Sequence, residues 1–191
     1  SDVCSSDLIT LTPTGINFIG DLTGTGLTAG LTVLTGDPLL GSLASNGGST
    51  QTMMPRLGSP VIDAVTAGNE VPGLTTDQRG FSRTLDGDGT GGAAPDLGAF
   101  ELARVLVTTE VDELNTPSSD GEGISLREAL RDGGTDLIVF AEVGAIRLNG
   151  SEIVVNDPTR SITLDATGLP YTQTIEGNAG PTRIFTVSAG S

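Results

Sequence analysis

The sequence contains no His, no Trp and no Lys, and its only Cys is Cys4. Without His, the chain has no Ser-His-Asp or Cys-His catalytic group, no His general base and no His-ligated zinc site. Without Lys, it has no phosphate-binding loop of the form G-x-x-x-x-G-K-[ST]. Aromatic residues make up only 3% of the chain, which argues against stacking platforms for bases or sugars. These absences exclude much of common enzyme chemistry.

The charge of the chain has one dominant sign. All 9 basic residues are Arg, and against 24 acidic residues they leave a net charge of −15 at pH 7. Such a charge repels phosphate backbones and anionic membrane surfaces. No apolar run approaches the ~18 residues that a membrane span needs. We therefore expect no nucleic-acid partner and no membrane contact within this segment, and we expect cations or neutral surfaces to be better partners.

The first eight residues differ in character from the rest. Their sequence, S-D-V-C-S-S-D-L (1–8), resembles the translation of a sequencing-adapter oligonucleotide fused in frame to a gene. Residues of that origin carry no information about the fold, so we exclude this stretch from its interpretation. The rest of the chain then has no cysteine.

Short apolar runs, broken by some of the 28 Gly and 10 Pro, predict an all-β fold. The runs alternate with period two over four to six residues, a pattern typical of short strands. We expect strands within residues 9–12, 15–20, 30–35, 104–107, 136–140, 145–148, 153–155, 161–164 and 183–187. Between 36 and 101 the chain is rich in turn dipeptides, which predicts a packed but irregular cap.

One helix is predicted, beginning at Ser125. The sequence S-L-R-E has the form of a capping box, in which Ser125 and Glu128 each bond to the backbone amide of the other. An apolar stripe follows, and Gly133-Gly134 is expected to end the helix after about two turns. We expect Arg127, Glu128 and Arg131 to form a solvated face with local charge pairs.

Strands this short cannot each close a hydrophobic core. Stacked as the rungs of a parallel β-helix they can, with Ile, Val and Leu in inward columns and the turns outside. A β-sandwich has a similar alternation and stays open as an alternative. The short capped helix favours the solenoid, because the end of a solenoid exposes strand edges that need a cover.

Five ordered blocks in the first half carry a family resemblance. The first half resembles the C-terminal end of a right-handed parallel β-helix of the choice-of-anchor Q type. The blocks are G-I-N-F-I-G-D (15–21), G-D-P-L-L-G-S-L-A-S-N-G-G (36–48), G-S-P-V-I-D-A (58–64), T-D-Q-R-G-F-S-R (76–83) and P-D-L-G-A-F-E (95–101).

The second half resembles the CSLREA module that opens a β-helix, through V-T-T-E-V-D-E-L-N (107–115) and I-S-L-R-E-A-L (124–130). That family usually has Cys at the position of Ile124, so the disulfide that the resemblance implies is lost. The two resemblances divide the chain into C-terminal rungs and cap of a first β-helix (9–101), a junction (102–104), and an N-terminal cap with first rungs of a second (105–191). They imply a tandem bacterial protein that is secreted or lies at the cell surface.

Asp86 and Asp88 are the candidate metal ligands. The sequence D-G-D-G-T places alternating oxygen ligands on a flexible loop, which suits Ca²⁺. A complete twelve-residue calcium loop would need acids at positions that hold Thr90 and Leu97. The favoured interpretation is therefore a turn whose carboxylates cap local amides, and Asp96 would join a metal site only if the loop folds back.

The chain offers no clear catalytic group. The resemblance to β-helix lyases implies one candidate, an acid paired with a positioned Arg, at Asp77 and Arg79 with Arg83 nearby. The favoured interpretation is structural: these charged pairs hold turns of the cap in place. Asp63 and Glu101 are expected to bond to backbone within the cap.

We therefore expect a non-enzymatic stalk or adhesin that presents a long face to extracellular glycans or proteins. The alternative is a fragment of a polysaccharide lyase or glycoside hydrolase whose active rungs lie outside this segment.

Overall fold

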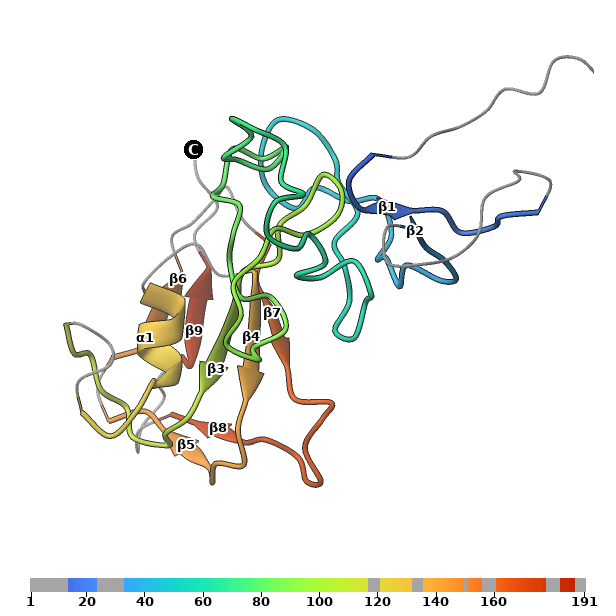
Figure 1. The fold of residues 1–191 in the computed structure, drawn as a ribbon. Coiled ribbons are helices and arrows are strands. Elements are labelled where there is room, and N and C mark those ends of the chain that lie inside the picture. The colour runs from blue at the N-terminus through green and yellow to red at the C-terminus, as the bar shows by residue number, and fades with distance from the viewer. Residues whose placement is uncertain are drawn as a thin grey trace, which may run out of the picture.

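The computed structural model describes residues 14–23, 33–116, 121–131, 136–149, 151–155, 161–177 and 183–187. In these ranges the chain is mostly strand with one short helix, and the strands form small parallel sheets (Figure 1). The prediction of a β-rich chain with a single short helix is confirmed at this level. The predictions for residues 1–8, for a strand at 9–12 and for the Gly133-Gly134 helix stop lie outside the described residues.

In the described residues of the second half, the strands form three parallel sheets. The largest has the strand order β3 (Arg104–Val107), β4 (Leu137–Phe140) and β7 (Thr163–Asp165). The other two sheets pair β5 (Ile146–Arg147) with β8 (Ile175–Glu176), and β6 (Ile153–Val155) with β9 (Phe185–Val187). Strands occur where the alternation predicts them, but β8 was missed because one isoleucine between polar residues makes no alternating pattern.

The strands pair in a regular order along the chain. β4, β5 and β6 follow one another, and β7, β8 and β9 pair with them in the same order. Paired residues are 26 apart in the first pair (137 and 163), 29 in the second (146 and 175) and 32 in the third (153 and 185). β3 pairs with β4 33 residues earlier (104 and 137). The chain thus returns to lie parallel to itself after similar intervals.

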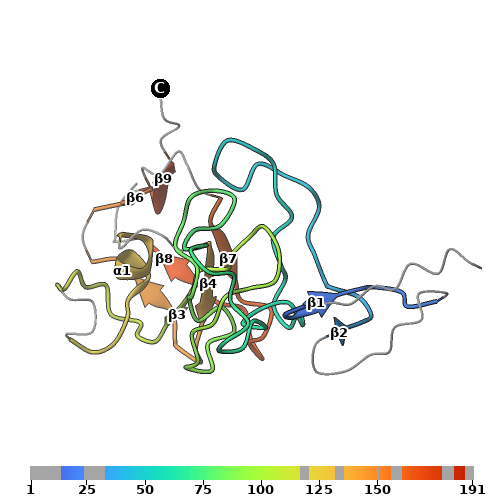
Figure 2. The ribbon, with the colours of Figure 1, turned by 45° about the horizontal axis from the view of Figure 1, so that its top comes forward.

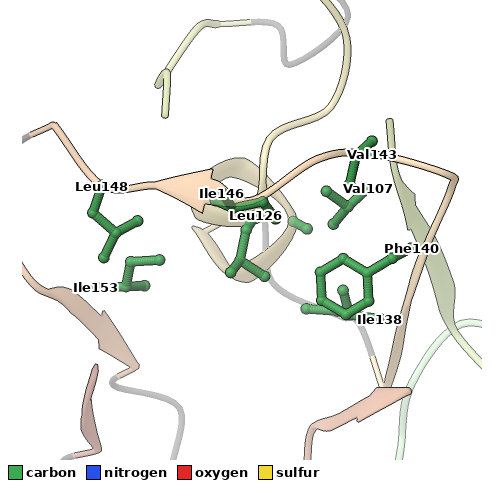
Figure 3. Packing of buried hydrophobic residues seen from close by; sticks show 9 residues of the cluster. Val107, Leu126, Ile138, Phe140, Val143, Ile146, Leu148 and Ile153 are labelled. Carbon is green, nitrogen blue, oxygen red and sulfur yellow. The ribbon is translucent and has the colours of Figure 1, made fainter. Parts of the chain in front are cut away.

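Strand β4 is buried on both of its faces and so departs from the alternation expected for it, because its sequence L-I-V-F is continuously apolar. Successive side chains of a strand point to opposite faces. Ile138 and Phe140 belong to an inner core between the sheets, which Figure 3 shows with side chains from β4, β5, β6 and the helix pointing into a shared interior. Leu137 and Val139 belong to a second core on the other face. The members of this second core that come from outside β4 are Ile62, Phe100 and Leu102.

Residues 36–101, called the cap from here on, form the other side of this second core. In the first half, β1 (Asn17–Phe18) and β2 (Val33–Leu34) make one short parallel pair. The cap that follows contains only isolated antiparallel bridges, such as that between Ala44 and Thr52, yet it buries Val61 and Phe100. It is packed and irregular, as predicted, and in Figure 1 it lies at the amino-terminal ends of β3 and β4.

The helix α1 (Leu126–Arg131) begins with the predicted capping box. The Ser125 amide donates to the Glu128 carboxylate at 2.9 Å, and the Glu128 amide donates to Ser125 Oγ at 3.1 Å. The helix, labelled in Figure 2, packs against β3 and β6. It buries Leu126 and Ala129. No helix in the described ranges has the length and apolar character to cross a membrane.

The prediction of a solvated face at Arg127, Glu128 and Arg131 is wrong for Glu128. Glu128 is 0% exposed, and its carboxylate also accepts the Asn115 amide at 2.6 Å. Glu128 thus satisfies amides from two segments at once. Arg127 is half-buried and pairs with Asp112 at 2.7 Å, while Arg131 is exposed.

Candidate functional site

A buried polar cluster surrounds the guanidinium of Arg79, whose side chain is 1% exposed. Arg79 lies in the cap within the block T-D-Q-R-G-F-S-R (76–83). A guanidinium has five N–H donors in a fixed planar fork. In this cluster each of them has an acceptor, namely Asp77 at 2.8 Å, Asp136 at 2.7 and 3.2 Å, and the carbonyls of Glu101 at 2.7 Å and Asn46 at 3.3 Å.

The two carboxylates that face Arg79 are also bonded to backbone amides. Asp77 Oδ1 accepts the amides of Arg79 and Phe81 at 2.8 and 3.1 Å, and its Oδ2 accepts the Glu101 amide at 3.2 Å. Asp136 accepts the Ala103 amide at 3.1 Å. A buried ion pair stabilises a fold only when its remaining polar atoms are bonded as well. This cluster meets that condition and joins the cap to the residue that precedes β4.

Two more buried acids extend the cluster through the cap. Glu101 is 1% exposed, and its carboxylate accepts the amides of Thr84, Leu85 and Asp96 at 2.9, 3.0 and 2.8 Å. The first of these bonds holds Thr84 at a φ of 81°, which a β-branched residue rarely adopts. Asp96 is 0% exposed and accepts the amides of Asp63 and Leu102 at 2.8 and 2.7 Å.

The apolar surroundings of Arg79 close the cluster to solvent. The guanidinium carbon lies 3.5 Å from the centroid of the Phe100 ring and 4.9 Å from that of Phe81, a cation–π arrangement. Gly48 approaches so closely that a Cβ at that position would lie 2.8 Å from Arg79 Cα. A substrate therefore has no access to the Arg79 guanidinium in this conformation.

The structure brings together several residues that the sequence singled out. Asp77 and Arg79 form the expected structural pair, and Glu101 and Asp63 bond to cap backbone as expected. Arg83 donates to the carbonyls of Gly98 and Asp96. Asp136 was missed because it lies 57 residues from Arg79 and has no local motif.

A second acidic group lies at the surface of the cap. One carboxylate oxygen each of Asp63, Asp86 and Asp88 lies within 4.8 Å of the others. The sequence indicated Asp86 and Asp88 as metal ligands, and the structure adds Asp63. Asp96 is not part of this group in the described ranges, since its two oxygens face the amides of Asp63 and Leu102.

The donor set of this group consists of hard carboxylate oxygens, which Ca²⁺ prefers. All three side chains also cap the loop. Asp63 accepts the Asp88 amide at 2.8 Å, Asp86 accepts the amides of Gly89 and Gly91 at 2.6 and 2.9 Å, and Asp88 accepts the Thr90 amide at 2.8 Å. Bonding to Thr90 lowers the pKa of the exposed Asp88, whereas burial raises the pKa of Asp63. The turn-capping role is present in the structure, and calcium binding at Asp86 and Asp88 stays a prediction.

Comparison with known proteins assigns the chain to no family and gives it no function. No family model, no curated protein and no solved structure matches the chain. The choice-of-anchor and CSLREA resemblances therefore stay predictions, and the functional argument depends on the geometry of the described residues.

The first prediction concerns the buried pair of Arg79. Arg79→Lys keeps the charge but replaces a five-donor fork by three donors, which leaves buried acceptors unbonded. We expect the free energy of unfolding to fall by about 3–5 kcal/mol in urea titrations. Arg147→Lys is the matched control, because that pair with Glu176 has the same 2.7 Å distance as Arg79 and Asp136 but side chains that are 74% and 42% exposed. The free energy of unfolding should be nearly unchanged in this control. Equal losses in the two variants would contradict the buried role.

The second prediction concerns pH. Burial raises the pKa of Asp96 from 3.8 to about 7, despite the opposing amide bonds from Asp63 and Leu102. Since the folded protein binds this proton more tightly than the unfolded chain, the contribution of Asp96 to stability is full below pH ~4 and is lost as the pH rises to ~7. We expect the stability of the wild type relative to Asp96→Asn to fall by on the order of 1–4 kcal/mol over that range. A difference that is flat or rises with pH would refute this.

The third prediction separates turn capping from calcium binding at Asp63, Asp86 and Asp88. If the carboxylates act only as caps, EGTA leaves the melting temperature of the protein unchanged, and we expect this result. If EGTA lowers it, Ca²⁺ restores it and Asp86→Asn abolishes the response, then the turn-capping account is incomplete and the calcium prediction is correct.

Proposed function

We propose that this chain is a non-enzymatic part of a large bacterial protein that is secreted or lies at the cell surface. In this proposal it joins the end cap of one right-handed parallel β-helix to the first coils of the next. The module acts as an elongated stalk or adhesin, whose outer faces contact extracellular glycans or proteins.

The order of strand pairing is the observation that carries this proposal. Three consecutive strands pair in parallel with three later ones in the same order, at separations of 26 to 32 residues (137 to 163 and 153 to 185). Successive coils of a β-helix have this relation, because each coil adds one strand to each face. A β-sandwich, the alternative from the sequence, consists instead of antiparallel sheets.

The start of the stack also fits a β-helix. β3 precedes β4 on one face, and Val111 forms a parallel bridge with Arg147 of β5 on the next. On the third face α1 packs against β6. In the proposed architecture these three segments form the opening coil, in which the helix takes the place of a strand and covers the core.

The non-enzymatic part of the proposal is supported by the arrangement of the buried acids. Lyases and glycoside hydrolases need carboxylates that face a sugar, with groups free to move a proton. The carboxylates of Asp77, Glu101 and Asp136 instead accept backbone amides in the interior. Their oxygens hold the cap together.

A surface hollow at one corner of the sheets offers a place for a neutral partner. It is lined by Glu142, Gly144, Tyr171, Thr172 and Thr174, among others. The Tyr171 hydroxyl donates to the Val143 carbonyl at 2.7 Å, which fixes a ring that is 43% exposed. An exposed ring among hydroxyl groups is suited to contact with a sugar.

The experiment that tests the proposal is an activity assay of the purified chain on polygalacturonate and on neutral polysaccharides. We expect no unsaturated product by ultraviolet absorbance and no reducing ends above a boiled control. Saturable turnover that Asp77→Asn or Arg79→Lys abolishes, in a variant that remains folded by circular dichroism, would overturn the non-enzymatic proposal.

A further inference from the structure

Two neighbouring turns at one corner of the sheets differ in length. The loop between β7 and β8 spans residues 166–174, whereas the turn between β4 and β5 spans residues 141–145. Because β7 pairs with β4 and β8 with β5, the two segments lie next to each other. In Figure 1 the longer loop extends away from the strands between β7 and β8. It therefore forms a projecting wall beside the shorter turn.

The first part of this loop is fixed by its own contacts. The Asp165 carboxylate accepts the Thr167 amide at 2.8 Å and the Thr167 hydroxyl at 2.7 Å. The Leu169 amide donates to the Ala166 carbonyl at 3.1 Å, and both of these side chains pack against the inner core. A loop that is already ordered loses little conformational entropy when it binds a ligand.

The last part of the loop leans back onto the shorter turn. The Tyr171 hydroxyl donates to the Val143 carbonyl at 2.7 Å, and the Gln173 side-chain amide donates to the Gly144 carbonyl at 3.0 Å. Both acceptors belong to the earlier of the two segments in the chain. Tyr171 and Gln173 thus contact the preceding coil of the proposed architecture, on the side away from any coil that follows.

The hollow introduced above lies between these two segments and has a volume of about 370 Å³. This volume is within the range of about 300–1,000 Å³ that is typical of small-molecule sites. All of its lining residues come from the turn 141–145 and the loop 166–174. Both walls are therefore present in the described part of the chain.

The lining of the hollow combines four exposed residues of different chemistry. They are Tyr171, Thr172, Thr174 and Glu142. The lining residues include no Arg, so they provide no positive charge for an anionic ligand. A neutral sugar ring matches this set, because its C–H face packs on an aromatic ring and its hydroxyls both donate and accept hydrogen bonds.

We infer that this hollow is a binding subsite for one or two residues of a neutral glycan. The Tyr171 ring packs on the face of a sugar, and the Glu142 carboxylate accepts its hydroxyl hydrogens. The hydroxyls of Thr172 and Thr174 bond to the remaining sugar oxygens. The inference rests on the proposed function, since it names the class of glycan and the residues that bind it.

The site has a single aromatic ring and is open to solvent, so its affinity is modest. We expect a Kd on the order of 1 mM for a short oligosaccharide. A glycan built of uronates is disfavoured, because Glu142 lies in the wall and the chain carries a net charge of −15. Since a neutral ligand has no charge to screen, its affinity should not depend on salt.

The sequence supplies a spectroscopic probe for this site. Tyr171 is the only Tyr, and the chain has no Trp. Intrinsic fluorescence excited outside the range of Phe absorption therefore comes from the ring that forms the wall of the hollow. A ligand that packs on this ring changes its emission, and one that binds elsewhere on the molecule does not contact it.

The test is a fluorescence titration of the 191-residue chain with neutral trisaccharides of glucose, galactose, mannose and xylose, and with trigalacturonate. We expect at least one neutral trisaccharide to give a saturable change, with the same Kd at about 0.05 and 0.5 M NaCl, and trigalacturonate to give none. No saturable response to any neutral sugar up to ~20 mM would overturn the inference. A stronger response to trigalacturonate would overturn it as well.

A pair of matched variants tests the role of the carboxylate. Glu142→Gln keeps the size of the side chain and removes its charge, and it should weaken binding about 5-fold, because hydrogen bonds to a carboxylate are stronger than those to an amide. The control is Glu70→Gln, an exposed residue of the cap, which should bind as the wild type does. Equal affinities in the two variants would contradict the assignment of Glu142.

The role of the ring is tested with Tyr171→Ala, followed by calorimetry because this variant has no fluorescent side chain. We expect binding to be lost while the circular dichroism spectrum stays that of the wild type. Binding that persists at wild-type affinity would overturn the inference. The binding and activity measurements are independent: turnover contradicts the non-enzymatic proposal alone, and absence of neutral-sugar binding contradicts the subsite alone.

Discussion

The fold depends on one buried cation. The Arg79 guanidinium donates to carboxylates or carbonyls from four separate segments, at Asn46, Asp77, Glu101 and Asp136. Three of these segments belong to the irregular cap, which in the described ranges has only isolated bridges between single residues. The fourth precedes the central strand β4. A segment without regular backbone pairing needs another way to satisfy its amides, and buried carboxylates held around one Arg supply it.

The same arrangement explains why the cap is rich in turns yet well packed. Backbone amides that would bond to a neighbouring strand in a sheet bond here to buried carboxylates. Each of three carboxylates accepts two or more amides: Asp77, Asp96 and Glu101. All three lie in the blocks T-D-Q-R-G-F-S-R (76–83) and P-D-L-G-A-F-E (95–101), on which the family resemblance depends. These blocks supply carboxylates that accept backbone amides, and they supply the ring of Phe100, which packs on the Arg79 guanidinium. They specify how an irregular segment closes over the outer face of β4.

Local patterns in the sequence predicted local structure well. The capping box at Ser125 and the strand at 104–107 were visible because their signals span only a few residues. Long-range partners were not visible. Asp136 looked like the start of a strand, and nothing near it indicated a buried pair with a residue 57 positions earlier. Glu128 looked solvated because it lies beside Arg127, but in addition to the Ser125 amide of the capping box it binds the amide of Asn115 in a separate loop. Polar burial is set by tertiary contacts, which periodicity does not encode.

A double-mutant cycle on Arg79 and Asp136 tests most directly whether the cap and the coils form one unit joined by this pair. The free energy of unfolding is measured for the wild type, Arg79→Met, Asp136→Asn and the combined variant. If the pair joins the two parts, the coupling energy should be about 2 kcal/mol or more in favour of the native pair. Additive losses, with a coupling energy near zero, would contradict the account.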